Sequence, residues 1–545
     1  MSLIVIISII PLLVVYNKIP EKYYPLVIFS IAISLLFHTS LISNYIWGWD
    51  IHYEYHYAEL VLNNLFWNPQ FDNPTNSVLS IVMLAPIFSI ISSIDLTWVF
   101  KIIYPFLFSF LPVGLYVLFQ NQTKDNKVSF LACFLFMAIF TFFGEMLSLA
   151  RQEVAELFLI LLMLSFFSKE NKPVLIIIFG MALTVSHYAL SYIYMFILAG
   201  VWILLIITSN TTIKGFIGRF KYLKTKLSKN ISFELDKKFT LNFVLLFIVF
   251  SITWYIYVSG YFTFETLIRT ISHIVSNIST DFLNRDTSQG LQIITTNMDS
   301  PIREITKYLY FVTQFLIIIG FIGLIFSKYK SKFDIKFIIF SFFNILICIG
   351  AIVLPYFAGS FNTSRLYFLS LIFLAPFCIL GSIIVFGFFN NIIKVLKDKK
   401  HENSLKIISI FLVIFFLFNT GFIVEFTNDY PSSFAFSEDA YSNFFEQDSD
   451  LASAQWMGMF NDSTQKYGMY FSRLSLISYG QSSPSDVILL YHWTDIRTIK
   501  PNSYIYVRSG DNNEIPQSNN NYAFSQDFIN NINEIYDSNS KIYLK

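Results

Sequence analysis

The stretch GWDIHYEYHYAE, residues 48–59, gathers three carboxylates and two histidines in a chain of which only 13% is charged. Asp50 and Glu54 stand four residues apart, and so do His52 and His56, so each pair would share one face of a helix. A carboxylate at a partly dehydrated surface can act as a general base, because loss of hydration raises its pKa towards neutrality. Two histidines at this spacing can instead chelate zinc, although no third ligand follows at a known spacing.

The surrounding residues predict the element that would hold these four side chains. Apolar residues recur at helical spacing from Ile51 to Phe66, which predicts an amphipathic helix over 51–66. Asp50 stands where a helix N-cap belongs, so its carboxylate would accept hydrogen bonds from free backbone N–H groups of the first turn. An interfacial helix with a capping Asp, a belt of Trp and Tyr and solvated charges would explain the same stretch without any chemistry.

Further polar side chains are expected at the same end of the molecule, each at a turn between two apolar runs. Arg151 lies at the first of these turns, and His187 and Tyr188 lie at the next. Arg365 lies at the last one. A guanidinium group can bind phosphate through two parallel hydrogen bonds, which suits transfer of a group from a lipid phosphate to a hydroxyl. Taken singly, each arginine is also compatible with a snorkelling anchor, and His187 with a helix-end residue.

The composition indicates a membrane protein. Of 545 residues, 55% are hydrophobic and 19% aromatic, which is more apolar surface than a soluble fold of this size can bury. The net charge of +1 gives no general attraction to nucleic acid, so the lipid bilayer is the expected partner and nucleic acid is not. About twelve runs have a length suited to a transmembrane helix. They are 2–16, 24–44, 98–119, 128–146, 152–168, 173–187, 190–208, 241–258, 308–327, 337–354, 366–388 and 406–426.

Lysine-rich loops predict the orientation, because Lys and Arg favour the cytoplasmic side of a membrane. The segment 209–240 holds eight Lys and Arg against two acidic residues and is expected to be cytoplasmic. The apolar stretch 78–93 is expected to lie on or dip into the outer leaflet, because a further span there would reverse the first external loop. The outward-facing segments would then be 45–97, 259–307, 355–365 and everything from 427 onwards.

The tail differs in character from the rest of the chain and is expected to fold as a small external α/β domain. Residues 427–545 hold 14 Asp and Glu against 7 Lys and Arg, and contain no run long enough to span a bilayer. Helices are predicted over 449–460 and 526–536. Strands are predicted over 467–471, 486–491, 503–508 and 541–544.

Four stretches resemble an uncharacterised family of archaeal multipass membrane proteins that is usually placed near the GT-C superfamily of integral-membrane glycosyltransferases. The resemblance, together with the topology, covers most of residues 1–430. It implies that the first-loop acid, Asp50, acts as a base or a metal ligand, and that the donor is a polyprenyl-phosphate sugar. His52 stands where that superfamily often has a second Asp, with Glu54 the nearest substitute, which favours a metal-independent enzyme. The four stretches are GWDIHYEYHYAE, WVFKIIYPFLFSFLPVGLYVLF (98–119), LARQEVAELF (149–158) and FNTSRLYFLSLIFLAPF (361–377).

These observations predict an all-α polytopic membrane protein of GT-C-like fold in residues 1–426, with about twelve transmembrane helices and an extracytoplasmic α/β domain in 427–545. We expect a multi-pass enzyme of the cell membrane that moves a sugar from a polyprenyl-phosphate (dolichol-phosphate-type) donor to a glycan, lipid or protein acceptor on the extracytoplasmic face. No cofactor is expected, and a divalent metal ion is not favoured. The alternatives are a transporter or flippase of lipid-linked saccharides and a non-catalytic membrane assembly protein.

Each polar residue then has an expected role. Asp50 would accept the proton of the acceptor hydroxyl, and Glu54 would adjust its pKa as the second catalytic residue. The arginines would hold the departing lipid phosphate. The expected substrate-binding residues are Arg151, Arg365, His187, Tyr188, His52 and His56.

Overall fold

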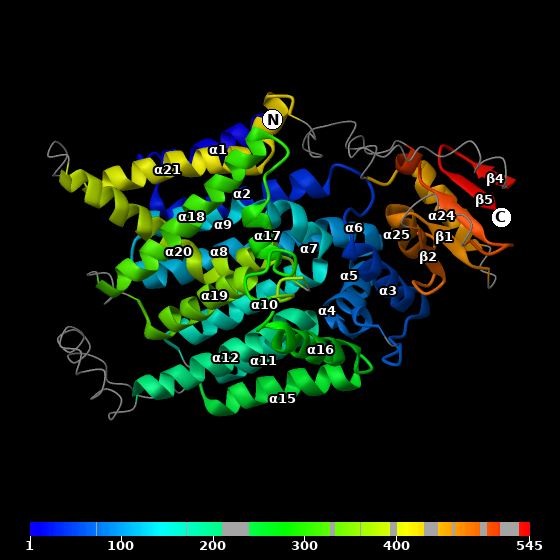
Figure 1. The fold of residues 1–545 in the computed structure, drawn as a ribbon, viewed down its shortest axis with the longest axis horizontal. Coiled ribbons are helices and arrows are strands. Elements are labelled where there is room, and N and C mark those ends of the chain that lie inside the picture. Colours follow the sequence, from blue (N-terminus) through cyan, green and yellow to red (C-terminus); the bar gives the residue numbers. More distant parts are fainter. Residues whose placement is uncertain are drawn as a thin grey trace.

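The protein is a bundle of helices with a small sheet domain at one end of its long axis (Figure 1). The computed structural model describes all 545 residues apart from 72, 171, 210–238, 327–332, 360, 393–399, 430–444, 460–463, 491–498 and 513–532. Helices of the first external loop lie between the bundle and the sheet domain (Figure 1).

Long apolar helices form the bundle, and each predicted span has a helix at its position. In the first half of the chain they are α1 (Ser2–Val15), α2 (Tyr24–Ser40), the continuous stretch of α6 (Leu96–Trp98), η3 (Val99–Ile103), α7 (Tyr104–Phe108) and α8 (Phe110–Thr123), then α9 (Asn126–Met137), η4 (Thr141–Glu145), η5 (Met146–Ser148), α10 (Ala150–Phe167), α11 (Pro173–Ser186) and α12 (Tyr188–Ser209). In the second half they are α15 (Leu241–Tyr257), α18 (Pro301–Phe326), α19 (Ile335–Val353), α20 (Thr363–Ile392), α21 (Lys400–Asn419) and α22 (Phe422–Phe426).

Fewer of these helices could cross a membrane alone than the predicted twelve. Among the described residues, seven are long and apolar enough by length and composition, or up to nine if each of two bent pairs is one span. Helices α1 and α11 fall short because they have only 14 residues each. Helix α10 is long enough, but its first two turns contain three charged residues. The structure therefore supports a multipass membrane protein, and the count of twelve is not confirmed.

The first external loop is built from short helices rather than a further span. They are α3 (Asp50–Asn64), η2 (Thr75–Ser77), α4 (Leu79–Val82) and α5 (Leu84–Ser92). The apolar stretch 78–93 is thus two short helices that pack against α3, together too short to span a bilayer. The second large loop contains two helices of its own, α16 (Phe262–Asn277) and α17 (Gln289–Thr295). Helix α16 is bent by 113° from α15.

Loops that were predicted to share a side of the membrane contact one another. At one end of the bundle, Asn126 donates to Glu21 at 2.5 Å and His401 lies 3.0 Å from Asp125. At the other end, Ser364 donates to Glu145 at 2.9 Å. These contacts agree with the predicted grouping of these loops, and the alternation across the membrane stays a prediction. The Lys-rich segment 209–240, on which the direction of the topology depends, lies almost entirely outside the described residues.

Helices α18 and α20 of the bundle approach each other at backbone distance. A Cβ on Gly320 would lie 1.9 Å from the backbone oxygen of Phe377, and one on Gly381 would lie 1.9 Å from that of Leu316. Small residues at such positions let two membrane helices approach at backbone distance, where dispersion forces are strongest. This contact fixes α20, the helix whose first turn contains Arg365.

The tail folds as an α/β domain, as predicted. Its sheet has five strands in the order β2-β1-β3-β5-β4, with β1 parallel to β2 and β3, and β5 antiparallel to β3 and β4. The strands are β1 (Lys466–Gly468), β2 (Val487–Leu489), β3 (Tyr504–Val507), β4 (Asn533–Asp537) and β5 (Lys541–Leu544). The helices are α24 (Asp448–Met459), α25 (Tyr470–Ser478) and the short η9 (Ser509–Asn512).

Two local predictions within this domain are wrong. The helix expected over 526–536 is strand β4 in its last residues, because pairing with β5 outweighs the local helical pattern, and 526–532 lie outside the described residues. The strand expected over 467–471 stops at Gly468, after which α25 begins. The helix predicted over 449–460 and the strand over 541–544 are confirmed as α24 and β5.

The sidedness of the loops generates a labelling prediction. In a variant whose native Cys133, Cys348 and Cys378 have been replaced, Asn63→Cys at the end of α3 should react with an impermeant thiol reagent in whole cells. Lys169→Cys, which is equally exposed at the opposite end of the bundle, should react only after the cells are permeabilised. Labelling of Lys169→Cys and protection of Asn63→Cys in intact cells would show that the orientation is inverted.

Candidate functional site

Arg151 at the start of α10 joins the two carboxylates of the first loop. Its Nη2 lies 2.5 Å from Asp50 Oδ2, and its Nη1 lies 2.6 Å from Glu54 Oε1. The three side chains differ in exposure: 7% for Arg151, 0% for Glu54 and 42% for Asp50. Asp50 and Glu54 therefore share one face of α3, as predicted, and of the two only Asp50 can be reached from outside.

Asp50 does not cap its helix. Helix α3 begins at Asp50 itself, its N-cap is Trp49, and no side chain caps it. The Asp50 carboxylate pairs with Arg151 instead, because a guanidinium offers a stronger, charge-assisted hydrogen bond than a backbone N–H. The predicted capping role is thus wrong, and the carboxylate is directed towards the bundle.

Glu54 binds the first turn of α10. Besides its pairing with the guanidinium, Glu54 accepts a hydrogen bond from the backbone N–H of Arg151 at 3.3 Å. The first N–H groups of a helix have no partner within the helix and favour negative charge nearby, so a carboxylate from α3 satisfies both needs. Complete burial raises the pKa of Glu54 to about 7, with the Arg151 charge opposing the rise and the Asp50 charge adding to it.

A glycine at position 48 and the side chain of Lys101 hold the segment before α3 close enough for these contacts. Gly48 has a φ of 125°, and a Cβ there would lie 2.1 Å from the Cβ of Ser148, just before α10. A residue other than glycine would be strained at this φ and would push the loop away. The buried Lys101 ammonium also holds the loop, because it donates to the carbonyls of Ser40 and, at 2.7 Å, of Tyr45.

His187, Tyr188 and Arg365 belong to the same end of the bundle. The guanidinium of Arg151 lies 5.7 Å from the centre of the Tyr188 ring, which is a cation–π distance. His187 is buried, its Nδ1 accepts the N–H of Leu190 at 3.2 Å, and the charges of both Arg151 and Arg365 act on its ring. Both arginines therefore lie within electrostatic reach of His187.

Arg365 is the less constrained of the two arginines. It is half-buried, and among the described residues its guanidinium has neither a hydrogen bond nor an ion pair. Glu145 is the nearest acid that feels its charge, but the Glu145 carboxylate is taken up by the hydroxyl of Ser364 at 2.9 Å. An anion from outside the protein could therefore bind Arg365 without first displacing an internal partner.

Sequence reasoning assigned no role to the two acids that continue the site along α10. Glu153 and Glu156 are buried, and the Glu156 Oε1 accepts a hydrogen bond from Gln152 at 2.8 Å. Within the described part of the chain, Glu153 Oε1 and Glu156 Oε2 have no hydrogen-bond partner. Two acids three residues apart, directly after Arg151, were the available signal, because ionisable groups inside a membrane helix are functional candidates.

The histidines of α3 are not exposed beside Asp50. The Nδ1 of His52 lies 2.9 Å from Ser478 Oγ in α25, and both His52 and His56 are buried where α3 meets that helix. Burial lowers the pKa of His52 to about 3 and that of His56 to about 4. Their predicted substrate-binding role has no support, because the C-terminal domain covers them. Among the described residues, no group of three or more His, Cys, Asp or Glu side chains is placed to hold a metal ion.

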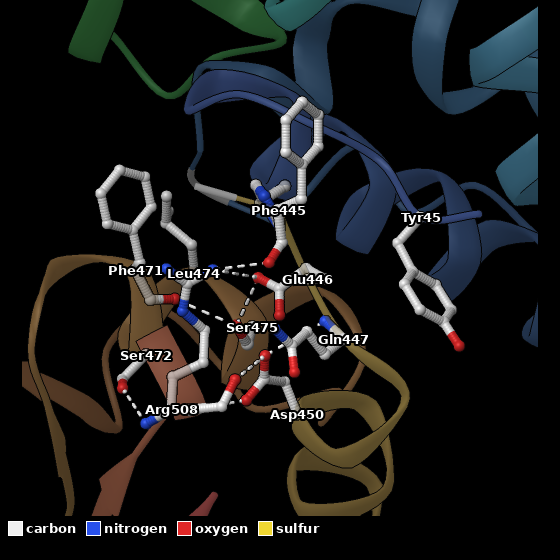
Figure 2. A network of polar contacts seen from close by, with 12 residues as sticks. Tyr45, Phe445, Glu446, Gln447, Asp450, Phe471, Ser472, Leu474, Ser475 and Arg508 are labelled. Atoms are coloured by element: carbon white, nitrogen blue, oxygen red, sulfur yellow. Dashed lines mark hydrogen bonds and ion pairs between the residues drawn. The ribbon is translucent and has the colours of Figure 1, made fainter. Parts of the chain in front are cut away.

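Further contacts hold α25 against α3. Arg473 of α25 donates a hydrogen bond to the Tyr53 hydroxyl, and Gln481 donates to Glu59 at the other end of the contact. The domain is braced internally by the buried Arg508, which lies 3.8 Å from Glu446, while Ser475 of α25 donates to the same carboxylate at 2.6 Å (Figure 2). The C-terminal domain is thus packed against α3, the helix that begins at Asp50.

The comparisons with known proteins agree with this architecture. A family model described as "Predicted membrane protein (DUF2206)" matches residues 172–544. No curated protein matches the chain. The matched region begins just before α11 and includes His187, Tyr188, Arg365 and the C-terminal domain, so it runs across the boundary predicted at 426.

The central ion pair generates a stability prediction. Arg151→Met should lower the free energy of unfolding in detergent by about 3–5 kcal/mol, because it leaves Glu54 buried without its partner. Combining it with Glu54→Leu should restore much of that loss, since no buried charge is then left uncompensated. Arg269→Met, which breaks the exposed pair with Glu265, is the control and should cost less than about 1 kcal/mol. Equal losses for the two arginine variants would show that the Arg151 pair does not organise the fold.

Proposed function

The chain belongs to the DUF2206 family of predicted membrane proteins, and we propose that it is a membrane glycosyltransferase. In this proposal it transfers a sugar from a polyprenyl-phosphate donor to an acceptor hydroxyl at the end of the bundle that carries α3. The observation that supports it most is the half-exposed Asp50 carboxylate held by a buried arginine. A carboxylate that is fixed on one side and open on the other suits a general base.

The proposed reaction is a direct displacement. The oxygen of the acceptor hydroxyl forms a bond to the anomeric carbon of the donor sugar, while the bond from that carbon to the lipid-phosphate oxygen breaks. The hydroxyl proton passes to the free carboxylate oxygen of Asp50, and the lipid phosphate leaves as the anion. Arg151 and Glu54 are positioning residues in this scheme, because neither is exposed enough to touch a substrate.

The donor phosphate is assigned to Arg365 alone. Arg151 was expected to share this task, but both of its terminal nitrogens already bind carboxylates, and the side chain is buried. Releasing it would leave Glu54 uncompensated in the interior, which is costly. Arg365 meets no such obstacle, and its position at the start of α20 suits a phosphate at the membrane surface.

The membrane arrangement forms part of the proposal. About twelve helices would cross or enter the bilayer, with α1 and α11 as short members, and the C-terminal domain would lie on the extracytoplasmic face. A metal-independent reaction is favoured because Arg151 already binds both Asp50 and Glu54, and His52, in the position of a second acid, faces the C-terminal domain. A flippase for lipid-linked saccharides is the alternative if no donor sugar is transferred.

Asp50→Asn tests the assignment of the base. With purified protein, radiolabelled polyprenyl-phosphate sugars and extracts of cell-envelope acceptors, this variant should lower kcat by about 10²–10⁴-fold and leave donor binding intact. EDTA should not change the wild-type rate. Asp286→Asn, which alters an exposed acid in the second large loop, is the control and should retain full activity. Near-normal turnover by Asp50→Asn would remove Asp50 from the mechanism.

Arg365 variants test the assignment of the phosphate. Arg365→Ala should weaken binding of a polyprenyl-phosphate sugar by roughly 10-fold or more, because it removes a charge-assisted contact worth about 1.5–3 kcal/mol. Arg365→Lys should recover only part of this, since a lysine cannot make the two-pronged contact. Arg269→Ala removes a comparable charge from the exposed part of α16 and should have no effect. If Arg365→Ala binds the donor as wild type does, the phosphate site lies elsewhere.

A further inference from the structure

Two aromatic side chains that belong to the start of α3 and the start of α25 are exposed. Trp49, which directly precedes Asp50, is 40% exposed, and Tyr470 at the first position of α25 is 45% exposed. Their neighbours behave differently: Trp47 is buried, with its ring stacked on that of Phe445 at 6.0 Å. Leaving a Trp and a Tyr exposed forgoes the large gain in free energy that burying such rings provides.

The docking of the C-terminal domain brings the start of α25, which is Tyr470, to the helix that begins at Asp50. Helix α25 is held on α3 by the hydrogen bond from Arg473 to Tyr53, and the guanidinium also lies 5.7 Å from the centre of the Tyr53 ring. Tyr470 begins that helix, and, after burial, the charge of Asp50 is the next largest cause of its raised pKa. Gln481, just after the end of α25, donates to Glu59, so α25 runs alongside α3 in the same direction. Tyr470, one turn before Arg473, therefore lies level with the start of α3 at Asp50.

The chemistry of this group fits one class of ligand. A sugar ring has one face of C–H groups and an edge of hydroxyls, so it stacks on an aromatic ring while its hydroxyls bind a carboxylate or a phenol. Trp49 and Tyr470 offer the rings, and Asp50 and the Tyr470 hydroxyl offer the polar contacts. A lipid acceptor would need an apolar path to the bilayer instead. The two rings lie where the first loop contacts the sheet domain rather than among the bundle helices. This position suits a ligand that arrives from the aqueous side.

We propose that Trp49 and Tyr470 form a saccharide-binding subsite in which a sugar ring of the acceptor stacks beside Asp50. This inference rests on the proposed function, because it names the acceptor class of the same site as a glycan rather than a lipid or an unglycosylated protein. Since one ring comes from the first loop and the other from the C-terminal domain, the subsite exists only when that domain is docked on α3.

Saccharide binding without any donor tests the subsite separately from catalysis. The purified full chain in detergent would be titrated with four neutral tetrasaccharides, maltotetraose, cellotetraose, mannotetraose and chitotetraose, and followed by calorimetry. At least one should bind, and Trp49→Ala or Tyr470→Ala should each weaken it by 10-fold or more. Trp49→Phe should bind within about 3-fold of wild type, because a phenyl ring still stacks. Tyr23→Ala removes an equally exposed tyrosine, 45%, at the opposite end of the bundle and should have no effect.

The outcomes separate the two proposals. Absence of binding by all four saccharides, or equal binding by wild type and the Trp49→Ala/Tyr470→Ala double variant, would overturn the subsite. Saccharide binding that depends on both rings, in a protein that transfers no sugar from any polyprenyl-phosphate donor, would support the subsite and contradict the transferase. In an active enzyme, the two alanine variants should raise KM for a glycan acceptor and leave KM for the donor unchanged.

Discussion

One buried arginine, Arg151 of α10, contacts two other helices, α3 and α12. Arg151 has little exposure and binds both Asp50 and Glu54, so its charge is compensated only when α3 lies against α10. A buried charge without its partner costs several kcal/mol, which makes this arrangement close to obligatory once α10 is in place. The first loop is therefore anchored by electrostatics as well as by apolar packing, because Ile51, Tyr55 and Ala58 of α3 are buried in a hydrophobic cluster.

The anchoring of α3 has consequences on both sides of that helix. Towards the bundle, Glu54 supplies the negative charge that the start of α10 requires, and the Arg151 guanidinium reaches the Tyr188 ring at the start of α12. On its other side, α3 offers Tyr53 and buried histidines to α25, so the C-terminal domain rests on a helix that the bundle has already fixed. The family match over 172–544 includes the later helices and this domain, and Arg151 links one of those helices, α12, to the first loop.

The distribution of exposure separates supporting residues from those that could meet a ligand. Glu54, Arg151 and His187 are buried, which suits groups that set position and charge. Asp50 is half-exposed and Arg365 half-buried, so the two remain open to a substrate from different elements of the same end of the bundle. Such a division, with a rigid buried layer beneath a few accessible groups, is what holds reacting groups in a productive geometry.

Periodicity and composition were enough to predict the helices of the bundle, the helix α3 and strand β5, because a helix or strand that must bury one face repeats apolar residues at its own period. The common face of Asp50 and Glu54 followed from the same spacing. The partner of that face did not, since Arg151 is 97 residues beyond Glu54 and only the packing of α10 on α3 brings the two together. The sequence predicts Asp50 as an N-cap because capping is a local interaction. In the structure the Asp50 carboxylate binds the distant Arg151 guanidinium instead. For the same reason the residues of β4 were predicted as helix, and His52 and His56 were predicted to bind substrate. Their surroundings come from β5 and α25, which no local pattern could reveal.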